Sequence, residues 1–161
     1  MSKRIYADFG YLIILASTFG AVLVLGAFVA PVVFHTDKIL SGILVDNYNA
    51  GIIMGEIFHR FSYWVYLVIL YVFIYESAIY KTGERDAISF ASALTVLFSG
   101  LMFSAVYSPK ILAMQALGAG ATKSDMFHNL HIASELDFKI LALSLIILFV
   151  RRLMLLRTVK R

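Results

Sequence analysis

The chain has 161 residues, of which 61% are hydrophobic, and its mean hydropathy is +0.86. Its apolar residues form long blocks, so we expect one integral membrane domain over residues 1–161. The chain contains no cysteine, which excludes disulfides, thiolate metal ligands and cysteine nucleophiles. We expect the net charge of +4 to reflect membrane topology and not a nucleic-acid partner.

The first predicted span covers residues 10–34, which carry no charged side chain. It is longer than the apolar core of a signal peptide, so we expect it to stay in the membrane. Small residues four apart, including Gly20 and Gly26 here and Gly100 in the third span, predict close approach of a neighbouring helix, within the chain or in a homo- or hetero-oligomer. Pro31 is expected to kink or end this helix.

Residues 36–56 mix charged and apolar side chains at roughly helical spacing, with a break near 47–51. We interpret them as an amphipathic helix on the outer membrane surface. The second span covers residues 58–80 and is rich in aromatic side chains at its ends, as is typical of the headgroup region. Glu76 lies near its far end and is expected to pair with Lys81 or Arg85.

A short polar turn predicts a hairpin into the third span, residues 87–107, which Ser-Pro-Lys at 108–110 is expected to end. The fourth span is predicted at residues 130–150. The uncharged run 140–150 is too short to cross about 30 Å of hydrocarbon at 1.5 Å per residue, so this span must include Glu135. The sequence thus predicts an all-α, four-transmembrane-helix up-down bundle.

Basic residues are unevenly divided between the two ends of such a bundle. Nine would share the end that holds both termini and the turn after span two: Lys3, Arg4, Lys81, Arg85, Arg151, Arg152, Arg157, Lys160 and Arg161. Only five fall toward the other end. The positive-inside rule therefore predicts that both termini are cytoplasmic, in an inner membrane, and that the histidines lie at the outer face.

Two groups of side chains at this outer end have the spacing of metal ligands. Glu56 and His59 are three residues apart, the arrangement used by carboxylate metal sites in four-helix bundles. His128, His131 and Glu135 share one face of the fourth helix, whereas Asp137 points nearly the opposite way. Together they predict a site for a transition metal, with copper favoured, since methionines lie at the same end.

Other interpretations remain open for these residues. His59, His128 and His131 would also suit axial ligation of haem, a proton relay or hydrogen bonding between helices. Glu135 and Lys139 are four residues apart and would then neutralise each other. No phosphate-binding loop or nucleophile elbow is present, so nothing in the sequence favours an enzyme.

Four segments also resemble a known family. They are VAPVVF at 29–34, AG at 50–51 leading to GEIF at 55–58, YSPK at 107–110 and FHNLHIAS at 127–134. They are similar to those of a bacterial four-span domain of unknown function related to the transmembrane-protein-205-like proteins. The resemblance implies a four-helix membrane protein with its polar motifs at one end, and some relatives are associated with metal or metallodrug handling.

The sequence thus predicts a membrane protein that binds a metal ion, copper favoured, at its outer face for transport, resistance or delivery. A haem-binding redox protein is one alternative. A structural subunit without a cofactor, assembled through its glycine-rich helix faces, is the other.

Overall fold

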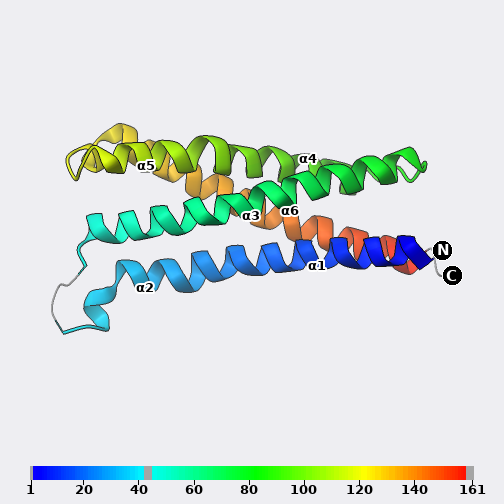
Figure 1. The fold of residues 1–161 in the computed structure, drawn as a ribbon, viewed down its shortest axis with the longest axis horizontal. Coiled ribbons are helices and arrows are strands. Elements are labelled where there is room, and N and C mark those ends of the chain that lie inside the picture. Colours follow the sequence, from blue (N-terminus) through cyan, green and yellow to red (C-terminus); the bar gives the residue numbers. More distant parts are fainter. Residues whose placement is uncertain (1, 42–44, 159–161) are drawn as a thin grey trace.

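In the computed structural model the chain forms four long helical rods that run along a common axis (Figure 1). The structure describes residues 2–41 and 45–158. The first rod consists of α1 (Ser2–Val24), the π-helix η1 (Leu25–Val29) and α2 (Ala30–Phe34), and the second is α3 (Asn47–Lys81). The third consists of α4 (Ala87–Leu101), the π-helix η3 (Met102–Tyr107) and α5 (Ser108–Ala116), and the fourth is α6 (Asp125–Thr158). Two 3-10 turns, η2 (Thr36–Lys38) and η4 (Ala121–Lys123), lie in the connections.

Three of the rods are long and apolar enough to cross a membrane: Ile5–Phe34, Asn47–Lys81 and Ala87–Ala116. The fourth, α6, has 34 residues and is about 51 Å long at 1.5 Å per residue, although charged side chains flank its apolar stretch. The predicted all-α, membrane-spanning architecture is therefore confirmed, and the chain is an integral membrane protein.

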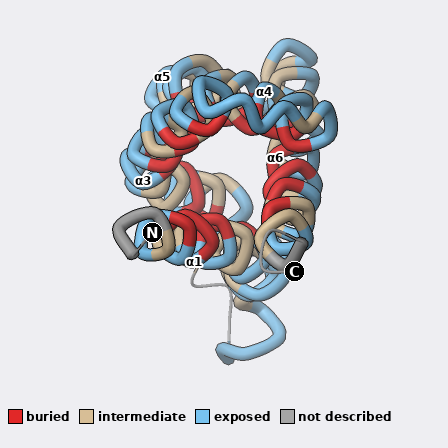
Figure 2. Tube along the Cα trace, turned by 90° about the vertical axis from the view of Figure 1, so that its right-hand side faces the viewer, coloured by how far each residue is buried: buried red, intermediate tan, exposed pale blue. Residues whose placement is uncertain are grey.

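The rods alternate in direction, so both termini and the turn from α3 to α4 lie at one end of the bundle, the termini end (Figure 1). The connections from α2 to α3 and from α5 to α6 lie at the opposite end, the loop end. Helix α6 packs against α4 and α1, and α3 packs against α4. Buried residues face the inside of the ring of helices, and exposed residues face outward (Figure 2).

The termini half of the bundle has a closely packed apolar core. Tyr11 and Leu15 on α1 are fully buried against Val72 on α3 and Leu145 on α6. The core ends on the first rod at Val22, because neither η1 nor α2 has a buried residue. The loop half is therefore less tightly closed than the termini half.

Only some of the small residues predicted to let helices touch do so within the chain. A Cβ at Gly100 would lie 2.9 Å from two carbons of Ile69, so α4 and α3 approach closely there, as predicted. At Gly20 and Gly26 a Cβ would have no heavy atom of a neighbouring helix within 4 Å, so neither glycine supports a close contact within the chain.

Both prolines of the chain sit just after a π-helical segment. Pro31 is the second residue of α2, after η1, and Pro109 is the second residue of α5, after η3. A proline in a helix removes one hydrogen bond and crowds the carbonyl four residues earlier, and the wider π turn accommodates this change. The expectation that Ser-Pro-Lys ends the third helix is therefore wrong, since the rod continues to Ala116.

The connection between the first two spans differs from the predicted amphipathic helix. Its described part contains the turn η2, and α3 already begins at Asn47. Asp46 caps α3, because its carboxylate accepts a hydrogen bond from the Asn49 backbone N–H at 2.8 Å. Residues 47–56 are thus the first turns of the second rod, and residues 42–44 lie outside the described part.

Candidate functional site

A cavity of about 770 Å³ lies at the loop end, between all four rods. Its inner part is apolar and is lined by Val22, Phe58, Phe103, Phe138 and Ala142. The three phenylalanine rings form a cluster, with centroids 5.0 Å apart for Phe103 and Phe138 and 5.3 Å for Phe58 and Phe138. A space of this size is in the range of small-molecule sites.

The part of the cavity near the loops is polar. Lys123 in η4, Asn47 at the start of α3 and His131 on α6 line it there, whereas Glu135 and Lys139 line the cavity further along α6, next to Phe138. Lys139 donates a hydrogen bond to Glu135 at 2.6 Å, so these two charges offset each other. The cavity thus has an apolar inner part and a polar outer part with a small excess of positive charge.

Gln115 on α5 forms the wall between α5 and α3. Its side-chain N–H donates to the Gly51 carbonyl at 2.8 Å, and its backbone carbonyl accepts from the Tyr48 hydroxyl at 2.8 Å. A Cβ at Gly55 would lie 2.5 Å from Gln115 Oε1, so a larger residue there would displace the Gln115 amide. This oxygen is buried and has no hydrogen-bond partner among the described residues.

The five predicted metal ligands are not all brought together. Of these five, only His131 and Glu135 line the cavity. Glu56 pairs with Arg60 at 2.7 Å, His59 lies 3.3 Å from the Tyr63 hydroxyl, and His128 is exposed.

Within the described part of the chain, no three His, Asp or Glu side chains are arranged to hold a metal ion. Of the predicted face of α6, His131 and Glu135 meet a cavity and not a second group of ligands, and His128 does not line that cavity. The metal or haem site therefore stays a prediction.

A buried polar network at the termini end was not predicted. Arg152 on α6 forms an ion pair with Glu76 on α3, and their side chains are 6% and 10% exposed. Tyr11 on α1 donates to the same carboxylate at 2.8 Å, and Tyr75 donates to Asp8 at 2.7 Å. The network thus links α1, α3 and α6 at the termini end.

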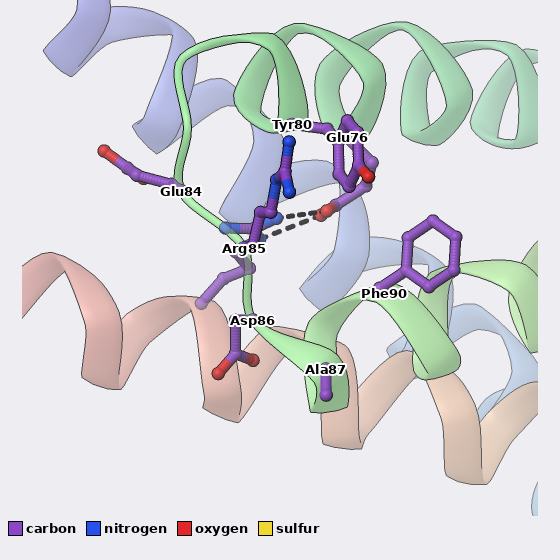
Figure 3. A pocket seen from close by; sticks show the side chains of 8 residues that line it. Glu76, Tyr80, Glu84, Arg85, Asp86, Ala87 and Phe90 are labelled. Atoms are coloured by element: carbon purple, nitrogen blue, oxygen red, sulfur yellow. Dashed lines mark hydrogen bonds and ion pairs between the residues drawn. The ribbon is translucent and has the colours of Figure 1, made fainter.

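The predicted pairing of Glu76 with Lys81 or Arg85 is therefore wrong, because Glu76 faces the bundle interior. Arg85 lies instead over the Tyr80 ring, 5.0 Å from its centroid. These residues border a smaller cavity of about 300 Å³, in which Figure 3 shows Arg85 extending from the turn toward Tyr80.

A second ion pair at this end fixes the turn into α4. Arg151 Nη2 donates to Asp86 Oδ1 at 2.6 Å, and Arg151 Nε donates to Asp86 Oδ2 at 3.0 Å. Asp86 also caps α4 by accepting from the Ser89 backbone N–H at 2.9 Å. The hydrogen bond from Arg151 holds the pKa of the Asp86 carboxyl well below its usual range.

The fold and cavity define a class: a four-helix integral membrane protein with an amphipathic cavity at one end. The chain belongs to the family described as a domain of unknown function, DUF4149, which it matches over residues 13–120. That range begins within α1 and ends before α6, so His131 and Glu135 lie outside it. Neither a curated protein nor a solved structure matches the chain. The relation to transmembrane-protein-205-like proteins stays a prediction.

Proposed function

We propose that this membrane protein binds a lipid-like amphiphile, with its chain in the inner part of the cavity and an anionic head at the polar part. The observation that carries the proposal is the division of one 770 Å³ cavity into an aromatic inner part and a basic outer part. Binding sites for small molecules combine apolar walls with a few polar groups in the same way.

The cavity as a whole is long enough for an extended chain together with its head. The lining residues of α6 run from Phe127 to Ala142, a length of about 22 Å at 1.5 Å per residue. Both π-helical segments contribute to the wall, with Gly26 and Ala27 from η1 and Phe103 from η3. Such segments occur frequently at functional sites.

The polar part favours an anionic head. Lys139 is offset by Glu135, whereas Lys123 makes no ion pair within the described residues. His131 adds a ring nitrogen for hydrogen bonding. An acidic head is favoured over a zwitterionic one, because only the acidic head gains a net attraction from Lys123.

Mass spectrometry of the lipids that remain with the purified protein tests this proposal. In Gly26→Phe the new ring would fill the cavity, since no atom lies within 4 Å of a Cβ at Gly26. We expect wild type to retain a stoichiometric amphiphile and Gly26→Phe to lose it. Gly20→Phe is the matched control, because Gly20 is equally open but does not line the cavity. Equal retention by all three proteins would contradict the proposal.

The head is tested by Lys123→Gln, with Lys110→Gln as control. Lys110 is an exposed lysine near the same end that does not line the cavity. We expect only Lys123→Gln to lower the retained fraction of acidic amphiphile. If both variants retain the same mixture as wild type, the head is not recognised through Lys123.

Binding of copper or another metal is a second proposal, supported by His131 and Glu135 lining one cavity. The carboxylate of Glu135 would first have to leave Lys139. Elemental analysis of the purified protein tests this proposal. Stoichiometric metal lost in His131→Ala would support it, and no stoichiometric metal in wild type would contradict it. The absorption spectrum of the same preparation distinguishes haem through its Soret band.

We also propose that the termini end faces the cytoplasm, supported by the excess of basic residues there. The amphiphile cavity would then open at the outer face of an inner membrane.

A further inference from the structure

Asp137 is a buried carboxyl group in the middle part of α6, within the predicted fourth span. The residue is 8% exposed. Its Oδ1 accepts a hydrogen bond from the Ser99 hydroxyl of α4 at 2.6 Å, whereas its Oδ2 is buried and has no partner among the described residues. A carboxylate is costly in such surroundings unless it is paired with a cation, and an ionisable group at this depth indicates function.

No cation is placed to neutralise Asp137 among the described residues. Helix α4 has no ionisable residue from Ala87 to Leu101, and η3 has only Tyr107. On α1 there is none after Tyr11. The side of α3 that reaches α6 presents Phe58 and Phe61 to Phe138.

On α6 itself the nearest charged residues are Glu135 and Lys139, which pair with each other on the exposed side. The remaining way to remove the charge of Asp137 is to add a proton.

Three buried serines follow one another along the third rod, from Ser99 beside Asp137 to Ser108 at the cavity. Ser108 lines the cavity and is 5% exposed, and Ser104, one turn further into the bundle, is 3% exposed. The hydroxyl oxygens of both have no partner among the described residues. Ser99, which is 1% exposed and bonds Asp137, comes next along the same rod.

The π-helix η3 contains Ser104 and lies directly between Ser99 and Ser108. Ser99 and Ser104 are both buried, so both face the inside of the bundle. Buried oxygens without a partner are the groups that internal water binds.

We propose that Asp137 is a proton-binding site inside the bundle and exchanges its proton with water in the cavity along Ser99, Ser104 and Ser108. The binding step adds one proton to a carboxylate oxygen and gives a neutral carboxylic acid. This proposal does not rest on the amphiphile proposal. None of its tests requires a bound amphiphile, so either proposal can fail without the other.

Infrared spectroscopy of the full chain in lipid tests the proposal. We expect the carbonyl band of a protonated carboxylic acid at neutral pH, its loss in Asp137→Asn, and a downshift of the band in D2O. A wild-type spectrum without this band, or a band that persists in Asp137→Asn, would show that Asp137 does not hold the proton. A band that does not shift in D2O would show that water does not reach it.

The path is tested by the rate of the D2O shift. Ser104→Ala together with Ser108→Ala should slow it, whereas Ser89→Ala should not, since Ser89 is as deeply buried but lies toward the termini end. Equal rates in these variants would overturn the path. If Asp137→Asn does not fold, the spectrum of Ser99→Ala is measured in its place. Ser99→Ala removes the 2.6 Å hydrogen bond to Asp137, so the carbonyl band must move if it belongs to Asp137.

Discussion

At the scale of single residues, the ion pairs at the two ends of the bundle differ in burial and in whether they join two helices. At the termini end the charges are buried and paired across helices, as between Arg152 and Glu76. Toward the loop end they are exposed and paired within one helix, as between Glu135 and Lys139, whose side chains are 56% and 68% exposed. A buried charge that loses its partner is far more costly than an exposed one.

We therefore expect Glu76→Gln to destabilise the protein strongly, by about 3–5 kcal/mol, because it leaves Arg152 buried without a counter-charge. Glu135→Gln is the matched control and should cost less than about 1 kcal/mol. Thermal unfolding in detergent measures both. Similar unfolding temperatures for the two variants would contradict the structural role of the network.

The pair of Asp86 and Arg151 predicts an acid-sensitive contribution to stability. Because the folded-state pKa of Asp86 is lowered, the contribution is fully present above the ordinary pKa of 3.8 and is lost as pH falls below it. Unfolding temperature measured against pH should therefore fall more steeply below about pH 4 in wild type than in Asp86→Asn, which can still cap α4. Parallel curves would show that this pair adds no pH-dependent stability.

At the scale of elements, the close approach of α4 and α3 depends on Gly100. Gly100→Ala should cost about 1–3 kcal/mol, because the new methyl group would crowd Ile69 at 2.9 Å. Gly20→Ala should be neutral or slightly stabilising, since it meets no atom and alanine favours helix. Thermal unfolding of the two variants checks this, and equal tolerance would mean that the helices are not in contact at Gly100.

The sequence predicts the helical elements well for a physical reason. A helix that crosses about 30 Å of hydrocarbon needs a long, predominantly apolar stretch, so residues 10–34, 58–80 and 87–107 stand out as blocks. The ends of these elements are less predictable. Pro109 predicts a helix end, yet the rod continues because the π-helix η3 before it accommodates the proline. Nothing local in residues 102–107 shows that a π turn will form.

The site is harder to predict than the fold, because it depends on which helices meet. Spacing alone places His128, His131 and Glu135 on one face, but only the packing shows that His131 and Glu135 reach the cavity. Glu76 and Arg152 are 76 positions apart in the chain, and their pairing follows only from the contact of α3 with α6. The cavity itself lies beyond the closely packed core, on the side of the loop end.

At the scale of the whole molecule, the proposed topology can be checked with reporters. A reporter inserted at Gly118, which lies in the loop between α5 and α6, should be outside, and one fused after residue 161 should be cytoplasmic. The opposite result would place the cavity mouth in the cytoplasm.

The most direct test of the amphiphile proposal is photo-crosslinking with a fatty acid that carries a diazirine near the end of its chain. Peptide mapping should find its adducts concentrated at the inner cavity wall, around Phe58, Phe103 and Phe138, and Gly26→Phe should abolish them. Adducts spread evenly over outward-facing residues such as Phe73 and Phe98, and unchanged in Gly26→Phe, would contradict a binding site in the cavity.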